Sequence, residues 1–351
     1  MTDLERYERL LRYELACQDA AERLLPFSRF TMPHPRFPHD ATQSRYSTVR
    51  AHEKMADLLE CMERGDVRKA IVTLPPRMGK TQTVHHNGVS WMWGRHPDWD
   101  IISATYGETF ARDHRNNIRT IIDGQRFRQA FPEFAVRQTG PDELLNHFGG
   151  HAYFLGRRSP TTGRGGNFIV VDDPVKDDKE GRSQVYRDDV WEWFTQTLWT
   201  RRHHDRVPVL VTMTRWHDDD IVGRITDKSN PKYAPKFADG WEVLRLPAIA
   251  EEDDPIGRAP GEALWPERYG VEALEEMRDA NPVAFSALYQ GDPAPEDGVF
   301  YLSEDIHTYD REDLERVRPS LVYYAASDHA VATTQINDLT CMGVFGVDPT
   351  G

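Results

Sequence analysis

Short apolar runs alternate with segments of helical periodicity along most of the chain. The apolar runs predict buried strands, and they lie at 70–74, 100–106, 167–174, 207–214 and 241–247. The segments between them predict helices, at 47–64, 80–93, 107–123 and 183–202. This alternation indicates an α/β fold.

The N-terminal 25 residues repeat apolar positions at helical spacing. Leu4, Tyr7, Leu11 and Leu15 would form one stripe. This stripe either packs on the protein or binds a partner. Residues 26–39 contain four prolines and three phenylalanines, which predicts an extended arm over the core.

The later part of the chain contains Gly- and Pro-rich segments between its predicted elements. A hairpin with a Gly-Gly turn is predicted at 147–155, followed by a Gly-rich loop. A helix is predicted at 271–288, and a Pro- and Gly-rich linker follows. Strands at 321–326 and 341–347 indicate that a second sheet begins near the C-terminus.

The run at 70–83 carries the first candidate chemistry. Its predicted strand leads through Pro-Pro-Arg-Met to Gly79, Lys80 and Thr81 at a helix start. Backbone N–H groups there favour an anion, while the lysine and the threonine suit terminal phosphates and Mg²⁺. Leu74 stands where the full pattern has glycine. The residues predicted around ATP are Pro76, Arg77, Met78, Gly79, Lys80, Thr81 and Gln82.

A second motif follows some 90 residues later, where the apolar run of 167–174 ends in Asp172 and Asp173. After a phosphate loop, such a strand is typical of an ATP site, with the first acid on Mg²⁺ and the second at the attacking water. The competing interpretation is a strand followed by an acidic turn.

Other polar and aromatic clusters have simpler interpretations. Arg112, Arg115 and Arg119 share a helix face that is either solvated or a DNA contact. The acids of 217–220 favour a helix N-terminus over a metal site. The tryptophans and phenylalanine of 191–199 favour core packing over a ligand cage.

Composition narrows the class of protein. The chain has 351 residues, 39% apolar and 28% charged, which suits one large or two ordinary globular domains. No apolar run is long enough to predict a membrane span. Cys17, Cys61 and Cys341 form no CxxC pair, which fits a reducing cytosol. A net charge of −14 argues mildly against a nucleic-acid coat protein.

Four segments occur in a telling order: LPPRMGKT, TGRGGNFIVVDDPVKD, VLVTMTRWHDDDIVGRI and YQGDPAPEDGVF. Together they resemble the large terminase subunit of tailed bacteriophages, the motor that packages viral DNA. The resemblance implies an ASCE-type P-loop ATPase, a mostly parallel central sheet flanked by helices with an extra strand between the two ATP motifs. The segment 100–106 would supply that strand.

The same resemblance implies a division into domains. The first strands of an RNase H-like nuclease domain would follow the ATPase. The expected parts are an N-terminal helix and Pro-rich arm (1–45), the ATPase core (46–245), a lid and linker subdomain (246–300) and an incomplete nuclease domain (301–351).

By position, the resemblance also assigns roles. Arg77 would sense the γ-phosphate within its own subunit, Lys80 would bind phosphates, and Thr81 with Asp172 would hold Mg²⁺. Asp173 stands where the family usually has the catalytic glutamate, so its reach to water is about 1.5 Å shorter.

Three further roles concern movement and assembly. Thr212, Thr214 and Arg215 would couple hydrolysis to movement. Arg164 would be a finger that reaches a neighbouring subunit's ATP. Asp328 would be the first metal carboxylate of a nuclease that needs two divalent ions, and the remaining acids of that site would lie beyond residue 351. We therefore expect no nuclease activity from the chain as given.

The implied partners are double-stranded DNA, the portal protein, the small terminase subunit and other copies in a homo-oligomeric ring on the procapsid, with no membrane. The implied location is the host cell cytoplasm, transiently at the portal. Two alternatives remain open: a helicase or remodelling P-loop ATPase, and a non-catalytic assembly protein whose ATP site has decayed.

Overall fold

The computed structural model describes residues 3–293, 315, 318–328 and 341–347. The chain separates into two compact units, Met1–Pro295 and Glu296–Gly351, and each is treated by itself. The predicted boundaries at 45 and 245 lie inside the first unit and stay predictions.

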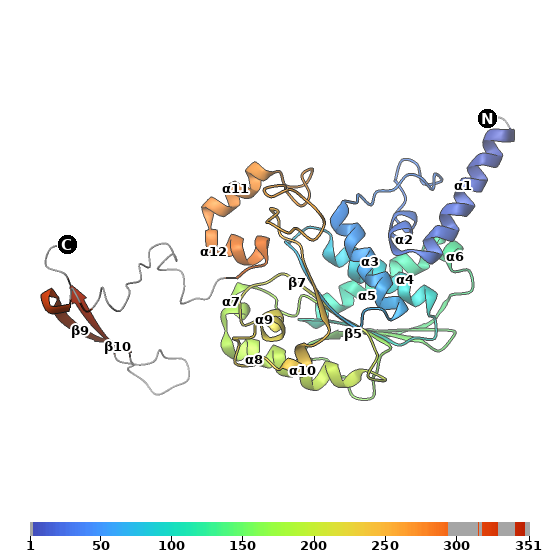
Figure 1. Ribbon diagram of the computed structural model, residues 1–351. Helices are drawn as coiled ribbons and strands as arrows, with labels where there is room; N and C mark the ends of the chain where they lie inside the picture. The colour runs from blue at the N-terminus through green and yellow to red at the C-terminus, as the bar shows by residue number, and fades with distance from the viewer. Residues whose placement is uncertain (1–2, 294–314, 316–317, 329–340, 348–351) are drawn as a thin grey trace. The chain divides into compact units, whose positions relative to one another are not determined.

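The first unit is built on an eight-stranded sheet (Figure 1). Its spatial order is β3-β4-β5-β2-β6-β7-β1-β8, and β5, β2, β6, β7, β1 and β8 run parallel. The strands are β1 (Lys69–Thr73), β2 (Ile101–Thr105), β3 (Val136–Thr139), β4 (Glu143–Asn146), β5 (His151–Gly156), β6 (Phe168–Asp172), β7 (Val209–Met213) and β8 (Trp241–Arg245). The predicted α/β fold with a mostly parallel sheet is confirmed.

The strand that lies between the two ATP motifs is not the expected one. In the sheet, β7 pairs with β1 on one side and with β6 on the other. The predicted segment, β2, lies beyond β6 and pairs with β5 and β6. The expectation for 100–106 is therefore wrong, because adjacency in sequence between the motifs does not fix adjacency in the sheet. The inserted strand instead brings Thr212 beside Asp172.

Alternate side chains of the strands enter two separate cores, as the two-residue period of a strand requires. On β1, Ala70 and Val72 join one core, while Ile71 joins the other. The helices of the first face are α2 (Leu24–Thr31), α3 (Arg50–Arg64), α4 (Gly88–Arg95), α5 (Glu108–Asp123) and α6 (Gln125–Ala130). Those of the second face are α7 (Asp178–Arg182), α8 (Gln184–Glu192), α9 (Ile221–Thr226) and α10 (Pro235–Ala238). The sheet is thus covered on both faces.

The N-terminal segment differs from the prediction in two ways. Helix α1 (Asp3–Glu22) carries its apolar stripe in solvent, with Leu4 67% and Tyr7 65% exposed. Leu11 and Leu15 are also exposed, so the interpretation that the stripe packs on the protein is wrong. Residues 26–31 belong to α2 and are not an extended arm. Burial of Phe27 and Phe30 supplies the reason, since a helix with Pro26 in its first turn places both rings in the core.

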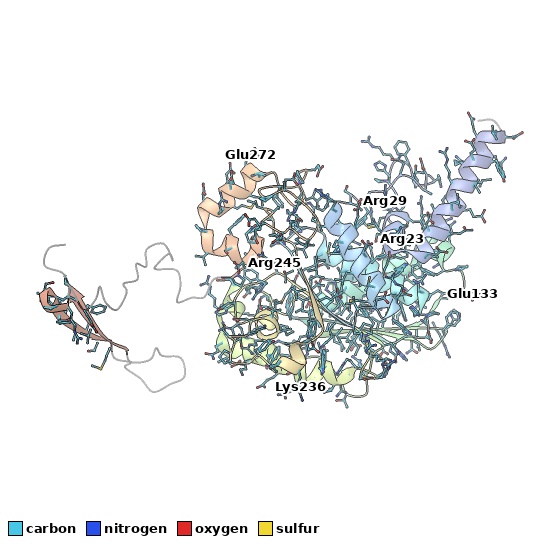
Figure 2. All side chains as sticks on the ribbon, viewed as in Figure 1. Arg23, Arg29, Glu133, Lys236, Arg245 and Glu272 are labelled. Carbon is cyan, nitrogen blue, oxygen red and sulfur yellow. The ribbon has the colours of Figure 1, made fainter. Side chains whose placement is uncertain are left out.

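Residues 246–293 form a small helical layer with its own core of Ala248, Ala263, Leu274 and Phe285. Its helices are α11 (Val271–Ala280) and α12 (Pro282–Phe285), followed by the π-helical turn Ser286–Gln290. Arg245, at the end of β8, donates a hydrogen bond to the Gln290 carbonyl at 3.0 Å (Figure 2). The predicted helix at 271–288 is confirmed, with a break at Asn281.

The second unit contains the antiparallel pair β9 (Val322–Asp328) and β10 (Cys341–Val347), which confirms the two predicted strands. Part of the linker, from residue 294 to 300, lies outside the described residues. Within the described part of the chain, no helix combines the length and the apolar character that crossing a membrane requires.

Candidate functional site

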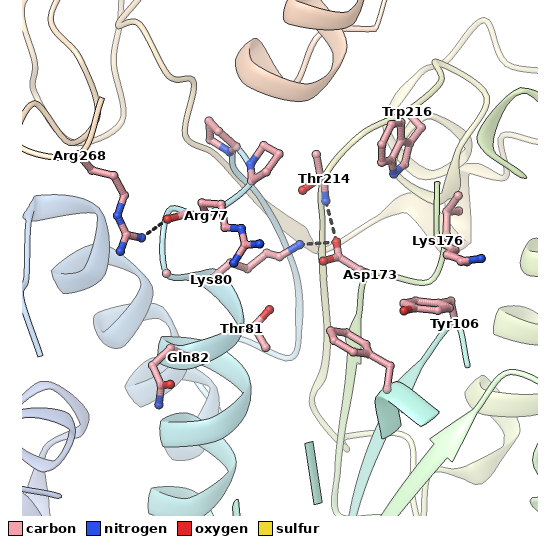
Figure 3. Close-up of a pocket in the computed structure, with 15 residues that line it drawn as sticks. Arg77, Lys80, Thr81, Gln82, Tyr106, Asp173, Lys176, Thr214, Trp216 and Arg268 are labelled. Carbon is pink, nitrogen blue, oxygen red and sulfur yellow. Dashed lines mark hydrogen bonds and ion pairs between the residues drawn. The ribbon is translucent and has the colours of Figure 1, made fainter. Parts of the chain in front are cut away.

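The predicted phosphate loop joins the end of β1 to a helix that begins with a π-helical turn, Thr81–Asn87. Two loop residues adopt left-handed backbone: Arg77 at φ 65° and Gly79 at φ 84°. A helix N-terminus with free N–H groups favours phosphate, so the local geometry fits the predicted chemistry. The loop lines a cavity of about 470 Å³ (Figure 3).

Position 79 has no room for a side chain. A Cβ at this position would lie 2.5 Å from Nε2 of His52, a buried ring behind the loop. Gly65 has a similar φ of 80° but nothing within 4 Å of the Cβ position. The two glycines therefore separate backbone strain from side-chain collision.

We expect Gly79→Ala to destabilise the protein more than Gly65→Ala. Both substitutions cost about 1–2 kcal/mol for the left-handed backbone, and only the first adds the collision with His52. Urea unfolding of both variants measures the difference. Equal losses of unfolding free energy would show that the loop relaxes away from His52.

Asp172 is the most deeply buried acid of the site, at the end of β6. Its Oδ2 accepts a hydrogen bond from the Thr81 hydroxyl at 2.8 Å, and its Oδ1 accepts one from Thr212 at 2.7 Å. Burial alone would raise the pKa of Asp172, yet Lys80 and two nearby histidines hold it below the usual range. Adjacent hydroxyl and carboxylate oxygens are the donors that Mg²⁺ prefers, so Thr81 and Asp172 fit the predicted ion.

Asp173 lies one residue further, in left-handed backbone at φ 43°. Its Oδ1 accepts a close hydrogen bond from Nζ of Lys80 and another from the Thr214 N–H at 2.9 Å (Figure 3). Its side chain keeps 29% exposure toward the cavity. Desolvation and the Asp172 carboxylate raise the pKa of Asp173, despite the lysine. The two neighbouring acids are thus pushed in opposite directions.

The strand β7 ends against these acids. Thr212 is bonded to Asp172, and the Thr214 hydroxyl reaches the Leu74 carbonyl at 3.5 Å. Arg215 is not among the residues that line the cavity, and its guanidinium binds Asp220 at 3.0 Å. The structure therefore brings two of the three predicted coupling residues into contact with the ATP motifs, and the third anchors the next helix.

Sequence reasoning missed several residues that line the cavity. Arg268, from the helical layer, donates a close hydrogen bond to the Arg77 carbonyl and lies over the Trp265 ring. Tyr106, Lys176 and Trp216 lie on the opposite side (Figure 3), and Phe110 and Val175 also line the cavity. No local motif marks Arg268, since 191 residues separate it from its partner. Of the predicted ATP residues, Met78 is buried beneath the loop and does not line the cavity.

Arg164 lies outside the residues that line this cavity. Its guanidinium forms an ion pair with Asp142 at 2.8 Å and lies over the Tyr153 ring. The side chain therefore contacts the edge of the sheet in its own chain, and its role toward a neighbouring subunit stays a prediction. Asp328 ends β9, and its side chain lies outside the part that the structure describes.

The acids of 217–220 serve the fold, as predicted. Asp220 caps α9 by accepting the Gly223 N–H at 2.8 Å. Asp219 accepts hydrogen bonds from the buried Arg224, from Arg187 and from Asn230. Among the described residues, the group that could hold a metal ion lies elsewhere.

The lowered pKa of Asp219 predicts that the stability of the protein depends on pH. Burial opposes its charge, but Arg224, Asn230 and Arg187 lower its pKa to about 2. Its stabilising contribution is therefore present above the unfolded pKa of about 3.9 and lost as the pH falls to about 2. We expect Asp219→Asn to cost about 2 kcal/mol at pH 7 and about half as much at pH 3, since the contribution is lost fully only as the pH falls through about 2. Urea unfolding at both pH values checks this, with Asp218→Asn as control. A cost that does not change with pH would contradict it.

The arginine face on α5 is largely occupied within its own helix. Arg119 binds Asp123 at 2.5 Å, and Arg115 donates to the Asn116 side chain at 2.9 Å. Arg112 is exposed. These contacts favour neither the solvated interpretation nor a DNA contact.

A family model described as "Terminase large subunit, T4likevirus-type, N-terminal" matches residues 71–305. The large terminase of bacteriophage HK97 superposes with a TM-score of 0.49 and 15% identity, over 93% of this chain and 64% of that one. This chain therefore spans 64% of that protein's length. A mutant large terminase ATPase domain from a Thermus phage gives 0.48 and 13%, over 71% and 95%. Curated protein sequences give no match.

Proposed function

Because the chain belongs to the T4-like large terminase subunit family, we propose that it is the ATP-hydrolysing motor subunit that moves double-stranded viral DNA into a procapsid. The observation that carries this proposal is the contact of the phosphate loop with both acids of β6, through Lys80 and Thr81. An intact pair of ATP motifs at the ends of β1 and β6 argues against a decayed site.

The phosphates of ATP would occupy the cavity beside the loop, and Thr81 and Asp172 would hold Mg²⁺. Mg²⁺ would neutralise charge that develops on the transferring phosphoryl group. Lys80 and Arg77 also line this cavity, so two cations lie where the phosphates would bind. Such fixed charges stabilise the transition state because they are already oriented when charge develops.

The contact between Lys80 and Asp173 suggests why Asp173 would orient the attacking water only when ATP is bound. In the structure, the carboxylate of Asp173 holds the ammonium of Lys80. A γ-phosphate would compete for the same ammonium, because it carries more charge than the carboxylate. Release of Lys80 would leave Asp173 held by the Thr214 N–H and free to orient the attacking water.

The same hydrogen bond offers a route from chemistry to movement. Thr214 follows β7 directly, and Thr212 on that strand is bonded to Asp172. A shift of either acid after phosphate release would therefore displace the end of β7. Arg268 connects the helical layer of 246–293 to the loop and would move with it.

We further propose the assembly that such a motor needs. It comprises a homo-oligomeric ring on the procapsid, contact with the portal protein and the small terminase subunit, and Arg164 acting on a neighbour's ATP. The expected place is the host cell cytoplasm. Endonuclease activity, with two divalent ions at a site that includes Asp328, is proposed only for a chain that supplies further acids.

The test is ATP hydrolysis by the purified chain with Mg²⁺, with and without double-stranded DNA. The proposal expects hydrolysis that rises when DNA is added. Strand separation on a forked duplex would favour the helicase alternative, since a translocase of intact duplex has no need to open it. Absence of ATP binding would favour the assembly-protein alternative.

A further inference from the structure

Three histidines form a buried cluster directly behind the ATP site. His85 and His86 lie in the π-helical turn that follows the phosphate loop, and His114 lies on α5. One ligand nitrogen from each ring lies within 4.8 Å of those of the other two. The rings of His85 and His114 have centroids only 4.0 Å apart. Burial lowers the pKa of all three, to about 4 for His86, so the cluster is neutral at pH 7.

Within the cluster, a nitrogen of His86 faces a nitrogen of His114, and a nitrogen of His85 has no partner. Nε2 of His86 lies 3.0 Å from Nδ1 of His114, so one of the two must carry the proton between them. Nε2 of His85 contacts the Ser103 hydroxyl at 3.2 Å, and its Nδ1 is buried without a hydrogen-bond partner. A buried polar atom without a partner is destabilising, so this nitrogen calls for a ligand or a water.

One outer contact of the cluster matches that of a metal-binding histidine. Such a histidine donates its second N–H to a carboxylate or another oxygen, which turns the remaining lone pair toward the ion. Nε2 of His85 contacts the Ser103 hydroxyl at 3.2 Å, as such a histidine does. Nε2 of His114 faces Oδ2 of Asp172 at 3.7 Å, beyond hydrogen-bond range, and is buried without a hydrogen-bond partner. In the ion-bound form, the proton shared by His86 and His114 would move to an outer ring nitrogen, Nδ1 of His86 or Nε2 of His114. The nitrogens then left for an ion are Nδ1 of His114, Nδ1 of His85 and Nε2 of His86.

We propose that His85, His86 and His114 bind one divalent transition-metal ion of the zinc type. Three neutral imidazoles suit Zn²⁺, Co²⁺ or Ni²⁺ and do not suit Mg²⁺, which prefers oxygen. Tetrahedral zinc–nitrogen bonds of about 2.0–2.1 Å place ligand nitrogens about 3.3 Å apart. The pair His86 and His114 is already near that spacing, and the wider pairs close by side-chain rotation.

The surroundings supply an entry path and a fourth position. His86 lines a second cavity, of about 310 Å³, which also borders Gln82 next to the phosphate loop. Water from this cavity completes a tetrahedral site. The ion would tie the start of the phosphate-loop helix to α5, immediately behind Asp172.

Equilibrium dialysis of the chelator-treated chain against Zn²⁺, with metal analysis, tests the proposal. We expect one equivalent of Zn²⁺ and, with Co²⁺, the intense visible absorption of a tetrahedral site. Loss of an outer-shell partner costs about 10–100-fold in metal affinity, so loss of a ligand in His86→Ala or His114→Ala should cost at least about 100-fold. His86→Ala is the variant of choice if the more deeply buried His114→Ala fails to fold.

Two controls identify the site. His147→Ala removes an exposed histidine on the β4–β5 turn and should leave Zn²⁺ binding unchanged. Thr81→Ala removes the proposed Mg²⁺ hydroxyl and should also leave it unchanged. No stoichiometric Zn²⁺, or Zn²⁺ that is lost in Thr81→Ala and kept in His86→Ala, would overturn the proposal. None of these outcomes depends on ATP hydrolysis.

Discussion

Lys80→Ala is expected to lower the rate of ATP hydrolysis at least about 100-fold, the usual effect of removing one preorganised charge from a transition state. The ammonium is buried between the loop and the two acids at the end of β6, where it contacts both carboxylates. ATP binding should weaken as well, since Lys80 meets the phosphates before and during reaction. Steady-state hydrolysis and nucleotide binding by calorimetry measure the two effects separately.

The matched control is Lys54→Ala, which removes an exposed lysine from α3. It should change neither hydrolysis nor binding. Lys80→Ala also leaves Asp172 and Asp173 without their cation, so its folding must be checked by urea unfolding. A folded Lys80→Ala protein that hydrolyses ATP within about threefold of the original rate would contradict the role of the loop. A threefold change means that the barrier has risen by less than about 1.4 kcal/mol, the value for a tenfold change.

The elements that the sequence predicted correctly are those set by local patterns. The apolar runs of β1, β6 and β7 have five buried or nearly buried residues each, and their ends carry the polar side chains of the site. Parallel strands bring their carboxyl ends to one edge of the sheet, so Lys80, Asp172 and Thr214 meet there without any further signal. The loop also shows why Leu74 can replace glycine. The left-handed backbone falls at Arg77 and Gly79, and Leu74 is buried.

The errors arise where contacts join distant segments. Pro26 and its neighbours resemble an extended arm, but burial of Phe27 against Phe127 and Phe131 favours a helix. The order of strands in the sheet depends on packing of the whole chain, so β7 could not be placed between β1 and β6 from its sequence. Arg268 is recognisable as a site residue only after the chain has folded.

The second large effect is expected from Asp173→Asn. The substitution keeps the shape of the side chain and removes its charge, so hydrolysis should fall about 100- to 10,000-fold, the range for loss of a general base. Unlike Lys80→Ala, it should preserve or tighten ATP binding, because Lys80 no longer has to leave a charged partner. Opposite effects on binding from two variants of one ion pair would support the exchange of Lys80 from Asp173 to phosphate.

The Asp173→Glu variant tests whether the shorter aspartate side chain is itself required at this position. Its carboxylate reaches about 1.5 Å further, one C–C bond, and would retain charge but move away from the Thr214 N–H. We expect activity between those of Asp173→Asn and the original chain. Asp178→Asn, which changes an exposed acid at the start of α7, is the control for loss of one negative charge. If Asp173→Asn hydrolyses ATP at the original rate, another group must orient the water. Asp172 is not the expected substitute, because it accepts hydrogen bonds from Thr81 and Thr212 and is proposed to hold Mg²⁺.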